Sequence, residues 1–226
     1  MPSALSGVDL SALWLTLQVA GCATTLALVL GTACGYALSR GRPPGRRFIE
    51  AVLTLPMVLP PTVLGYYLIV VLGRRSALGG WLEAEFGLRL MFTWQGAVVA
   101  AALVAFPLVF TSARAAFDGV ERNLENAGRV LGASEAKVFL RITLPLALRG
   151  IGAGAMLAFA RAMGEFGATL MIAGNIPGRT QTLSMAIYDA VQSGNDALAD
   201  TLVAVVSIVC VLLLVLAARL LEVRRA

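Results

Sequence analysis

The sequence predicts an all-α integral membrane protein with about five transmembrane helices, six being the upper bound. Of its 226 residues, 58% are hydrophobic and 14% are charged, and the mean hydropathy is +0.83. A soluble domain typically carries roughly 25% charged residues. Several uncharged stretches also reach the about 20 residues that a helix needs to cross a bilayer, where a helix satisfies its own backbone hydrogen bonds. Residues 1–226 are therefore expected to form a single transmembrane domain.

The expected spans follow the apolar runs along the chain. The stretches without any charged residue are 10–39, 51–73, 90–113 and 201–218. A further apolar stretch, 150–176, is interrupted only by Arg161 and Glu165. Residues 183–192 are too few to cross the membrane, and we expect them to form a helix at its outer surface.

Pro60 and Pro61 lie in the middle of the second span. Proline removes a helical hydrogen bond and clashes with the preceding turn. In a bilayer, an interrupted helix is tolerated only where it packs against protein or lines a cavity. We therefore expect either a span broken beside a transport path or, alternatively, a simple helix whose prolines mark its cytoplasmic entry.

The placement of the cations predicts the orientation of the chain in the membrane. The net charge is +5, and thirteen of the 18 cations lie in the connections after the first and third spans or in the C-terminal tail. Because cytoplasmic segments are rich in Lys and Arg, the N-terminus is expected outside and the C-terminus in the cytoplasm. This distribution reflects membrane topology, so no nucleic-acid partner is expected.

Arg161 and Glu165 are the charged residues inside the fourth predicted span. At a spacing of four residues they share one helix face, and they can neutralise each other as an ion pair within the bundle. Alternatively, they border a translocation path, because charges inside a membrane often mark one. Polar residues follow toward the outer side and offer hydroxyl and amide groups that suit an oxyanion. The candidate pathway residues are Pro60, Pro61, Arg161, Glu165, Thr169 and Asn175.

The long connection at 114–143 is the segment in which we expect a cytoplasmic partner to bind. Apolar residues recur there at helical spacing, at Val120, Leu124, Ala127, Val130, Leu131, Val138, Phe139 and Ile142. This pattern predicts two short amphipathic helices, separated at Gly132 by a sharp turn and followed by Ser134 as a helix cap. A pair of helices lying on the membrane surface is the alternative interpretation.

The residues of this sequence do not suit an enzyme. The chain contains no histidine, and its only lysine, Lys137, does not follow a glycine-rich phosphate-binding loop. No serine elbow of the hydrolase type is present. The three cysteines have no metal-ligand spacing. We therefore expect no catalytic residue, metal site or cofactor in this chain.

The stretch 124–145 closely resembles the "EAA" coupling loop of binding-protein-dependent ABC importer permeases. The resemblance implies a type I ABC importer permease fold whose loop docks into a cytoplasmic ATPase. Ala127, Gly132, Ile142 and Pro145 match the motif. Its Glu-Ala-Ala aligns with residues 126–128, so Glu125 stands one position early. The residues expected to couple to the ATPase are Glu125, Asn126, Ala127, Gly132, Ala133, Ser134, Ile142 and Pro145.

Residues 55–67 and 160–178 look like the corresponding segments of molybdate permeases. This resemblance implies a homodimer in the bacterial inner membrane, with two ATPase subunits that use ATP and a periplasmic or lipid-anchored receptor that delivers the anion. The alternatives are a tungstate or sulfate/thiosulfate permease and, more remotely, a secondary transporter or a membrane scaffold that does not transport.

Overall fold

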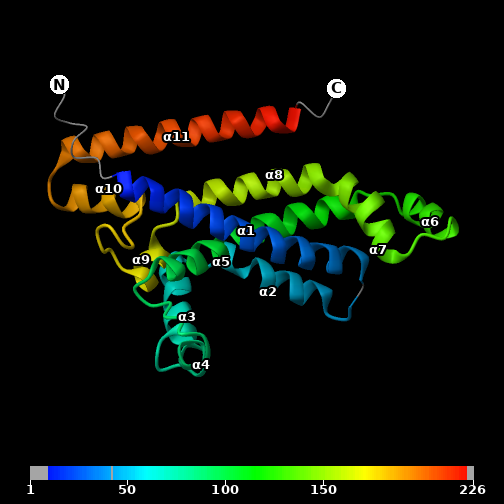
Figure 1. Cartoon of the computed structure of the whole chain (residues 1–226), viewed down its shortest axis with the longest axis horizontal. Coiled ribbons are helices and arrows are strands. Elements are labelled where there is room, and N and C mark those ends of the chain that lie inside the picture. The colour runs from blue at the N-terminus through cyan, green and yellow to red at the C-terminus, as the bar shows by residue number, and fades with distance from the viewer. Residues whose placement is uncertain (1–9, 42, 223–226) are drawn as a thin grey trace.

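The computed structural model describes residues 10–41 and 43–222, and the described part is built of helices and their connections (Figure 1). The predicted exterior N-terminus, Arg42, Arg224 and Arg225 lie outside the described residues. The helices are α1 (Leu10–Arg40), α2 (Arg46–Val58), α3 (Pro61–Leu72), α4 (Ala77–Phe86), α5 (Trp94–Asp118), α6 (Arg122–Val130), α7 (Glu135–Val138), the π-helical turn η2 (Phe139–Thr143), α8 (Leu144–Met163), α9 (Gly167–Ala173), α10 (Leu183–Gln192) and α11 (Asp196–Glu222).

Helices α1, α5 and α8 pack against one another and form the core of the bundle. Glycines spaced four residues apart line both surfaces that face α5: Gly31 and Gly35 on α1, and Gly150 and Gly154 on α8. A Cβ atom at Gly35 would lie 2.9 Å from the backbone nitrogen of Arg114 on α5. Small residues at this spacing let helix backbones approach closely in a membrane, where packing contacts drive helix association.

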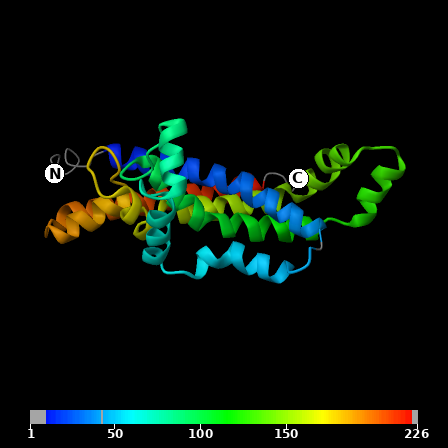
Figure 2. The same cartoon turned by 90° about the horizontal axis from the view of Figure 1, so that it is seen from below.

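The second predicted span is broken, as the prolines indicate. Helices α2 and α3 meet at an angle of 111°, with Leu59 and Pro60 in extended conformations between them. Residues that precede a proline avoid the helical region, which explains the extended backbone at both positions. Figure 2 shows α2 running along the bundle and α3 turning across it. Pro107, in contrast, lies inside the continuous helix α5.

Helix α8 begins with a widened turn. Pro145 has no N–H to donate to the carbonyl of Arg141, and the preceding residues Phe139–Thr143 form the π-turn η2. Together α7, η2 and α8 make one helix from Glu135 to Met163. The segment that carries the end of the predicted coupling loop is therefore continuous with a membrane helix.

The prediction of about five spans is confirmed. Four helical segments are long and apolar enough to cross a membrane, namely 11–40, 94–118, 135–163 and 196–213, and the bent pair α2–α3 makes a fifth. The predicted bounds of the fourth span, 150–176, are wrong. Its helix begins earlier and ends at Met163, because the chain leaves the helix at Gly164 before restarting as α9. The predicted short helix at 183–192 is present as α10.

Candidate functional site

Helices α6 and α7 form a hairpin that projects from one end of the bundle (Figures 1 and 2). Its turn is a Schellman motif: the N–H of Gly132 donates to the carbonyl of Arg129, and the N–H of Ala133 donates to that of Gly128. Gly132 has a φ of 82°, a left-handed conformation that favours glycine. The structure thus confirms two short helices separated at Gly132, within the predicted loop.

An ion pair inside the base of the hairpin holds α6 in place. The carboxylate of Glu125 is only 4% exposed, and its Oε1 accepts hydrogen bonds from Arg40 Nη2 at 2.7 Å and from Thr143 Oγ1 at 2.6 Å. Arg40 ends α1 and Thr143 ends η2. Glu125 therefore joins α6 to two membrane helices and faces the interior of the protein.

The exposed tip of the hairpin is apolar. Val130 is 87% exposed and Leu131 is 86% exposed, and both belong to the apolar pattern that predicted the two amphipathic helices. They are exposed because α6 ends at Val130 and the turn carries both side chains outward. The buried side is formed by Glu125 and Gly128. Exposed apolar side chains on a projecting element are typical of a protein interaction surface.

The other predicted coupling residues occupy the surface and the turns of the hairpin. Asn126 and Ala127 are exposed on α6, and Asn126 Oδ1 accepts a hydrogen bond from Arg129 at 2.8 Å. Arg129 also pairs with Glu135 across the turn at 2.6 Å, and this hydrogen bond raises the pKa of Arg129. The same hydrogen bond lowers the pKa of Glu135, and an ion pair therefore closes the turn.

Ser134, Ile142 and Pro145 lie on the α7–α8 side of the hairpin. Ser134 occupies the N-cap position of α7, but its side chain makes no capping hydrogen bond, so the predicted capping interaction is absent there. Ile142 packs under α6, where a Cβ atom at Gly128 would lie 2.8 Å from Ile142 Cδ1. Pro145 is exposed in the first turn of α8. Gly128 is thus small because α6 lies directly on Ile142.

The break between α2 and α3 opens beside Arg161. A cavity of about 270 Å³ is lined by Leu59 and Pro61 at the break and by Arg161 in the last turn of α8. The other residues that line it are Pro56, Met57, Leu64, Val104 and Leu108, all apolar. The guanidinium of Arg161 is the charged group of this cavity, and its side chain is 37% exposed. Two features predicted from the sequence, the broken second span and the arginine within the fourth span, therefore meet at one place.

Glu165 serves as a structural partner of both Arg161 and α9. Its Oε2 lies 2.9 Å from Arg161 Nη2, and its Oε1 accepts a hydrogen bond from the N–H of Ala168 in the first turn of α9. The side chain is only 2% exposed. The predicted ion pair is therefore present, and it also caps the helix that follows the break in the fourth span.

The remaining pathway candidates do not line the cavity at Arg161. Pro60 is exposed at the N-cap of α3. Thr169 is buried in α9, and Asn175 is half-buried in the loop after it; Thr169 Oγ1 and Asn175 Oδ1 make no hydrogen bond within the described residues. The structure therefore brings Pro61 and Arg161 together and places the two polar residues further along, around α9.

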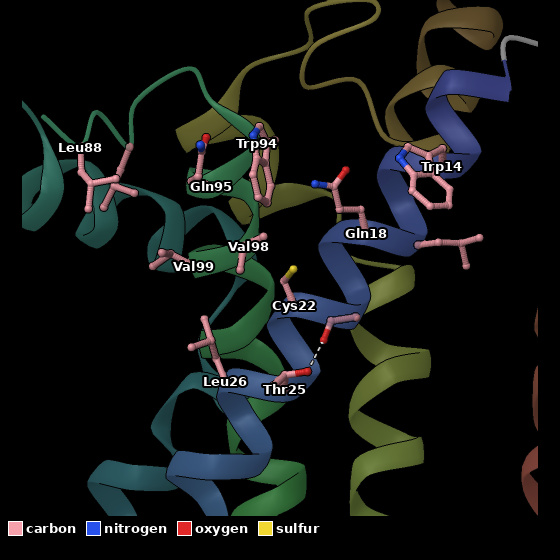
Figure 3. A pocket seen from close by; sticks show the side chains of 13 residues that line it. Trp14, Gln18, Cys22, Thr25, Leu26, Leu88, Trp94, Gln95, Val98 and Val99 are labelled. Atoms are coloured by element: carbon pink, nitrogen blue, oxygen red, sulfur yellow. Dashed lines mark hydrogen bonds between the residues drawn. The ribbon is translucent and has the colours of Figure 1, made fainter. Parts of the chain in front are cut away.

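A larger cavity of about 810 Å³ lies between α1 and α5 and carries no charge. Figure 3 shows Gln18 and Cys22 of α1 pointing toward Trp94 and Val98 of α5. Its lining is apolar apart from two glutamines and one threonine. A dianion gains little from such a surface, because burying a charge without a partner is costly. Size alone therefore does not make this groove a candidate anion site.

Three residues that organise the site were not predicted from the sequence. Arg40 and Thr143 bind the carboxylate of Glu125, and Gly128 lets α6 approach Ile142. Arg40 and Thr143 lie 85 and 18 positions from Glu125 along the chain, so no local pattern connects them. The one available signal in the sequence was that Glu125 stands one position before the glutamate of the motif, which indicated that its role differs from that of the motif's glutamate.

Replacing Arg40 by Met is expected to destabilise the protein by about 3 kcal/mol, because it leaves the buried carboxylate of Glu125 without its charged partner. Arg47→Met, at an exposed arginine in the first turn of α2, is the matched control and should change stability by less than about 0.5 kcal/mol. Thermal unfolding in detergent, followed by tryptophan fluorescence, measures both. The double variant Arg40→Met/Glu125→Met should recover most of the loss, and equal unfolding temperatures for Arg40→Met and Arg47→Met would contradict the role of this ion pair.

Comparison with known proteins identifies the family. Residues 24–225 match the model of the family described as binding-protein-dependent transport system inner membrane component. The chain is 44% identical over 215 residues to a putative molybdenum transport system permease protein of Bacillus subtilis, covering 95% of each chain. It is 45% identical over 189 residues to the molybdenum transport system permease protein of Escherichia coli K12, covering 84% of this chain and 82% of the relative.

A solved structure confirms the fold. A chain from the structure of the methionine ABC transporter in inward-facing conformations superimposes with a TM-score of 0.76 at 19% identity, covering 99% of both chains. The described helices therefore have the arrangement of an ABC importer permease, as the sequence resemblance implied. On the family match and on the two relatives, the chain belongs to the family of inner membrane components of binding-protein-dependent transport systems.

Proposed function

We propose that this chain is the membrane permease of an ATP-driven importer that carries molybdate into the cell. The observation that carries the proposal is the projecting α6–α7 hairpin, whose apolar tip leads through the turn at Gly132 into a membrane helix that runs from Glu135 to Met163 and carries Arg161 in its last turn. Such an element suits the transfer of movement from a cytoplasmic motor to the membrane. The relatives named for molybdenum transport support the choice of anion.

In this proposal, the tip of the hairpin docks into a separate ATPase subunit that binds and hydrolyses ATP. Val130 and Leu131 would be buried in the contact, and Asn126, Ala127 and Ser134 border them on the exposed surface. The helix from Glu135 to Met163 has 29 residues. At 1.5 Å per residue it is roughly 40 Å long, so it connects the docking point directly to the far part of the membrane region.

A second copy of the chain is proposed to cover the exposed apolar face of α2. Helix α2 has no buried residue. On it, Phe48 is 74% exposed, Val52 is 49% exposed and Met57 is 62% exposed. Two permease chains, two ATPase subunits and a periplasmic or lipid-anchored receptor would then make up the importer. ATP and the loaded receptor would each favour one of two arrangements of the permease pair.

We further propose that Arg161 lines the path of the anion at the break between α2 and α3. Its guanidinium pairs with the carboxylate of Glu165 but remains partly exposed in a cavity with otherwise apolar walls. One such cation attracts an oxyanion, and the neighbouring carboxylate keeps that attraction weak. Weak contacts suit a permease, because a tightly held anion would leave slowly.

The direct test is uptake of radiolabelled molybdate by proteoliposomes that contain this chain, its ATPase and its receptor. We expect ATP-dependent uptake that tungstate inhibits strongly and sulfate inhibits weakly. Strong competition by sulfate would move the protein to the sulfate permeases.

Leu131→Asp should reduce co-purification of the ATPase, whereas Glu121→Gln, also exposed on the hairpin, should not. Uptake without any ATPase would contradict the importer assignment and favour a secondary transporter.

The role of Arg161 is separated from that of its ion pair by a double variant. Arg161→Gln alone should lower both stability and uptake, because it leaves the buried carboxylate of Glu165 without a charged partner. Arg161→Gln/Glu165→Gln removes both charges and should recover stability while uptake stays low, roughly tenfold below wild type. The measurements are thermal unfolding and initial uptake rate. Full recovery of uptake would assign Arg161 to neutralising Glu165 only.

A further inference from the structure

A pocket at the connections on either side of α4 is lined by three arginines. Arg74 and Arg75 follow α3 and Arg89 follows α4, and in Figure 1 these helices lie away from the α6–α7 hairpin. Together with Met91 and Phe92, the arginines line a cavity of about 660 Å³. No acidic residue lines this pocket. It is therefore a concave, positively charged surface, distinct from the cavity at Arg161.

The orientation proposed for the chain makes this cluster unusual. External connections of membrane proteins are poor in Lys and Arg. Arg74, Arg75 and Arg89 are three of the four cations that the sequence places in external connections, and the structure gathers these three around one cavity. Membrane topology therefore does not account for these three arginines.

The charges around the pocket are only partly balanced. Glu83 of α4 pairs with Arg74 Nε at 3.1 Å and with Arg89 Nε at 2.8 Å, and the hydrogen bond from Arg74 lowers the pKa of Glu83. Within the described residues, Arg75 has no ion-pair partner, and Glu85 is an exposed neighbour on α4 outside the lining. Glu83 thus holds two guanidinium groups in position while a third remains free.

The rim of the pocket is tied to the elements around the proposed anion path. Phe92 has a φ of 58°, which is rare for a residue other than glycine. Its N–H donates to the carbonyl of Ile172 in α9 at 2.9 Å, and α3 leads from the pocket to the break at Pro61. A strained residue held by tertiary contacts is frequent at binding sites. The pocket therefore lies at the C-terminal ends of α3 and α9, whose first residues follow the two chain breaks near Arg161.

We propose that this arginine pocket binds a tetrahedral oxyanion on the outer side of the membrane, either free or as the phosphate of a lipid headgroup. Guanidinium groups match such anions because each presents several N–H donors in a plane. The Ser76 hydroxyl already bonds the backbone around it, so the arginines supply the donors. The inference that a free anion enters the path from here rests on the proposed function.

Two arms of one experiment distinguish the two sources of the anion. In the first, the permease–ATPase complex in dodecyl maltoside, without receptor, is titrated with radiolabelled molybdate. In the second, the complex is placed in nanodiscs that contain phosphatidylglycerol. The complex is then released from the nanodiscs, and the lipid that stays bound to it is measured by native mass spectrometry. Each arm compares wild type with Arg75→Gln and with Arg179→Gln, another external, exposed arginine that lies outside the pocket.

We expect Arg75→Gln to weaken binding roughly tenfold in one arm, as the loss of a charge-assisted hydrogen bond predicts, while Arg179→Gln has no effect. Loss in the first arm assigns the pocket to the free anion, and loss in the second assigns it to lipid. Equal behaviour of Arg75→Gln and wild type in both arms overturns the pocket. Binding that depends on Arg75 without any ATP-driven uptake would instead overturn the proposed function and leave the pocket standing.

Discussion

The burial of Glu125 is the constraint on which the arrangement of the cytoplasmic end depends. A carboxylate that is 4% exposed needs a charged partner and further hydrogen bonds, and Arg40 and Thr143 provide them. Because these partners end α1 and η2, the hairpin cannot shift without moving either helix or breaking the ion pair. The contact therefore makes the projecting hairpin and the membrane helices behave as one body, which a coupling element requires.

The membrane region shows how the same chain combines rigid and interrupted elements. Close packing at glycines holds α1 and α8 against α5, whereas prolines and a glycine interrupt the chain at 59–61 and at 164–166. Both interruptions lie beside Arg161 and Glu165. Polar backbone at membrane depth is tolerated where protein surrounds it, and the paired charges help to satisfy it. The interrupted helices are thus located where a polar path is proposed, next to a rigid helix that reaches the hairpin.

The sequence predicted the elements that depend on local chemistry. Long apolar runs predicted the spans, consecutive prolines predicted the break after α2, and Gly132 predicted the turn of the hairpin. It did not predict which side of α6 is buried, because Val130 and Leu131 follow the helical period yet lie at the helix end, where the turn directs them outward. Nor did it predict the partners of Glu125 or the gathering of Arg74, Arg75 and Arg89, because these contacts join segments distant in sequence or depend on how loops fold. The bounds of the fourth span were missed since apolar composition continues through the break at Gly164.

If Glu125 transmits movement of the hairpin to the membrane helices, the number of molybdate ions taken up per ATP hydrolysed depends on its carboxylate, and that ratio is the most direct measurement. The comparison is between the reconstituted importer with Glu125→Gln and that with Glu121→Gln, whose exposed side chain lies at the start of the same helix. We predict that the Glu125→Gln importer retains its ATPase and hydrolyses ATP but transports fewer ions per ATP, while Glu121→Gln behaves as wild type. An unchanged ratio for Glu125→Gln would contradict the account.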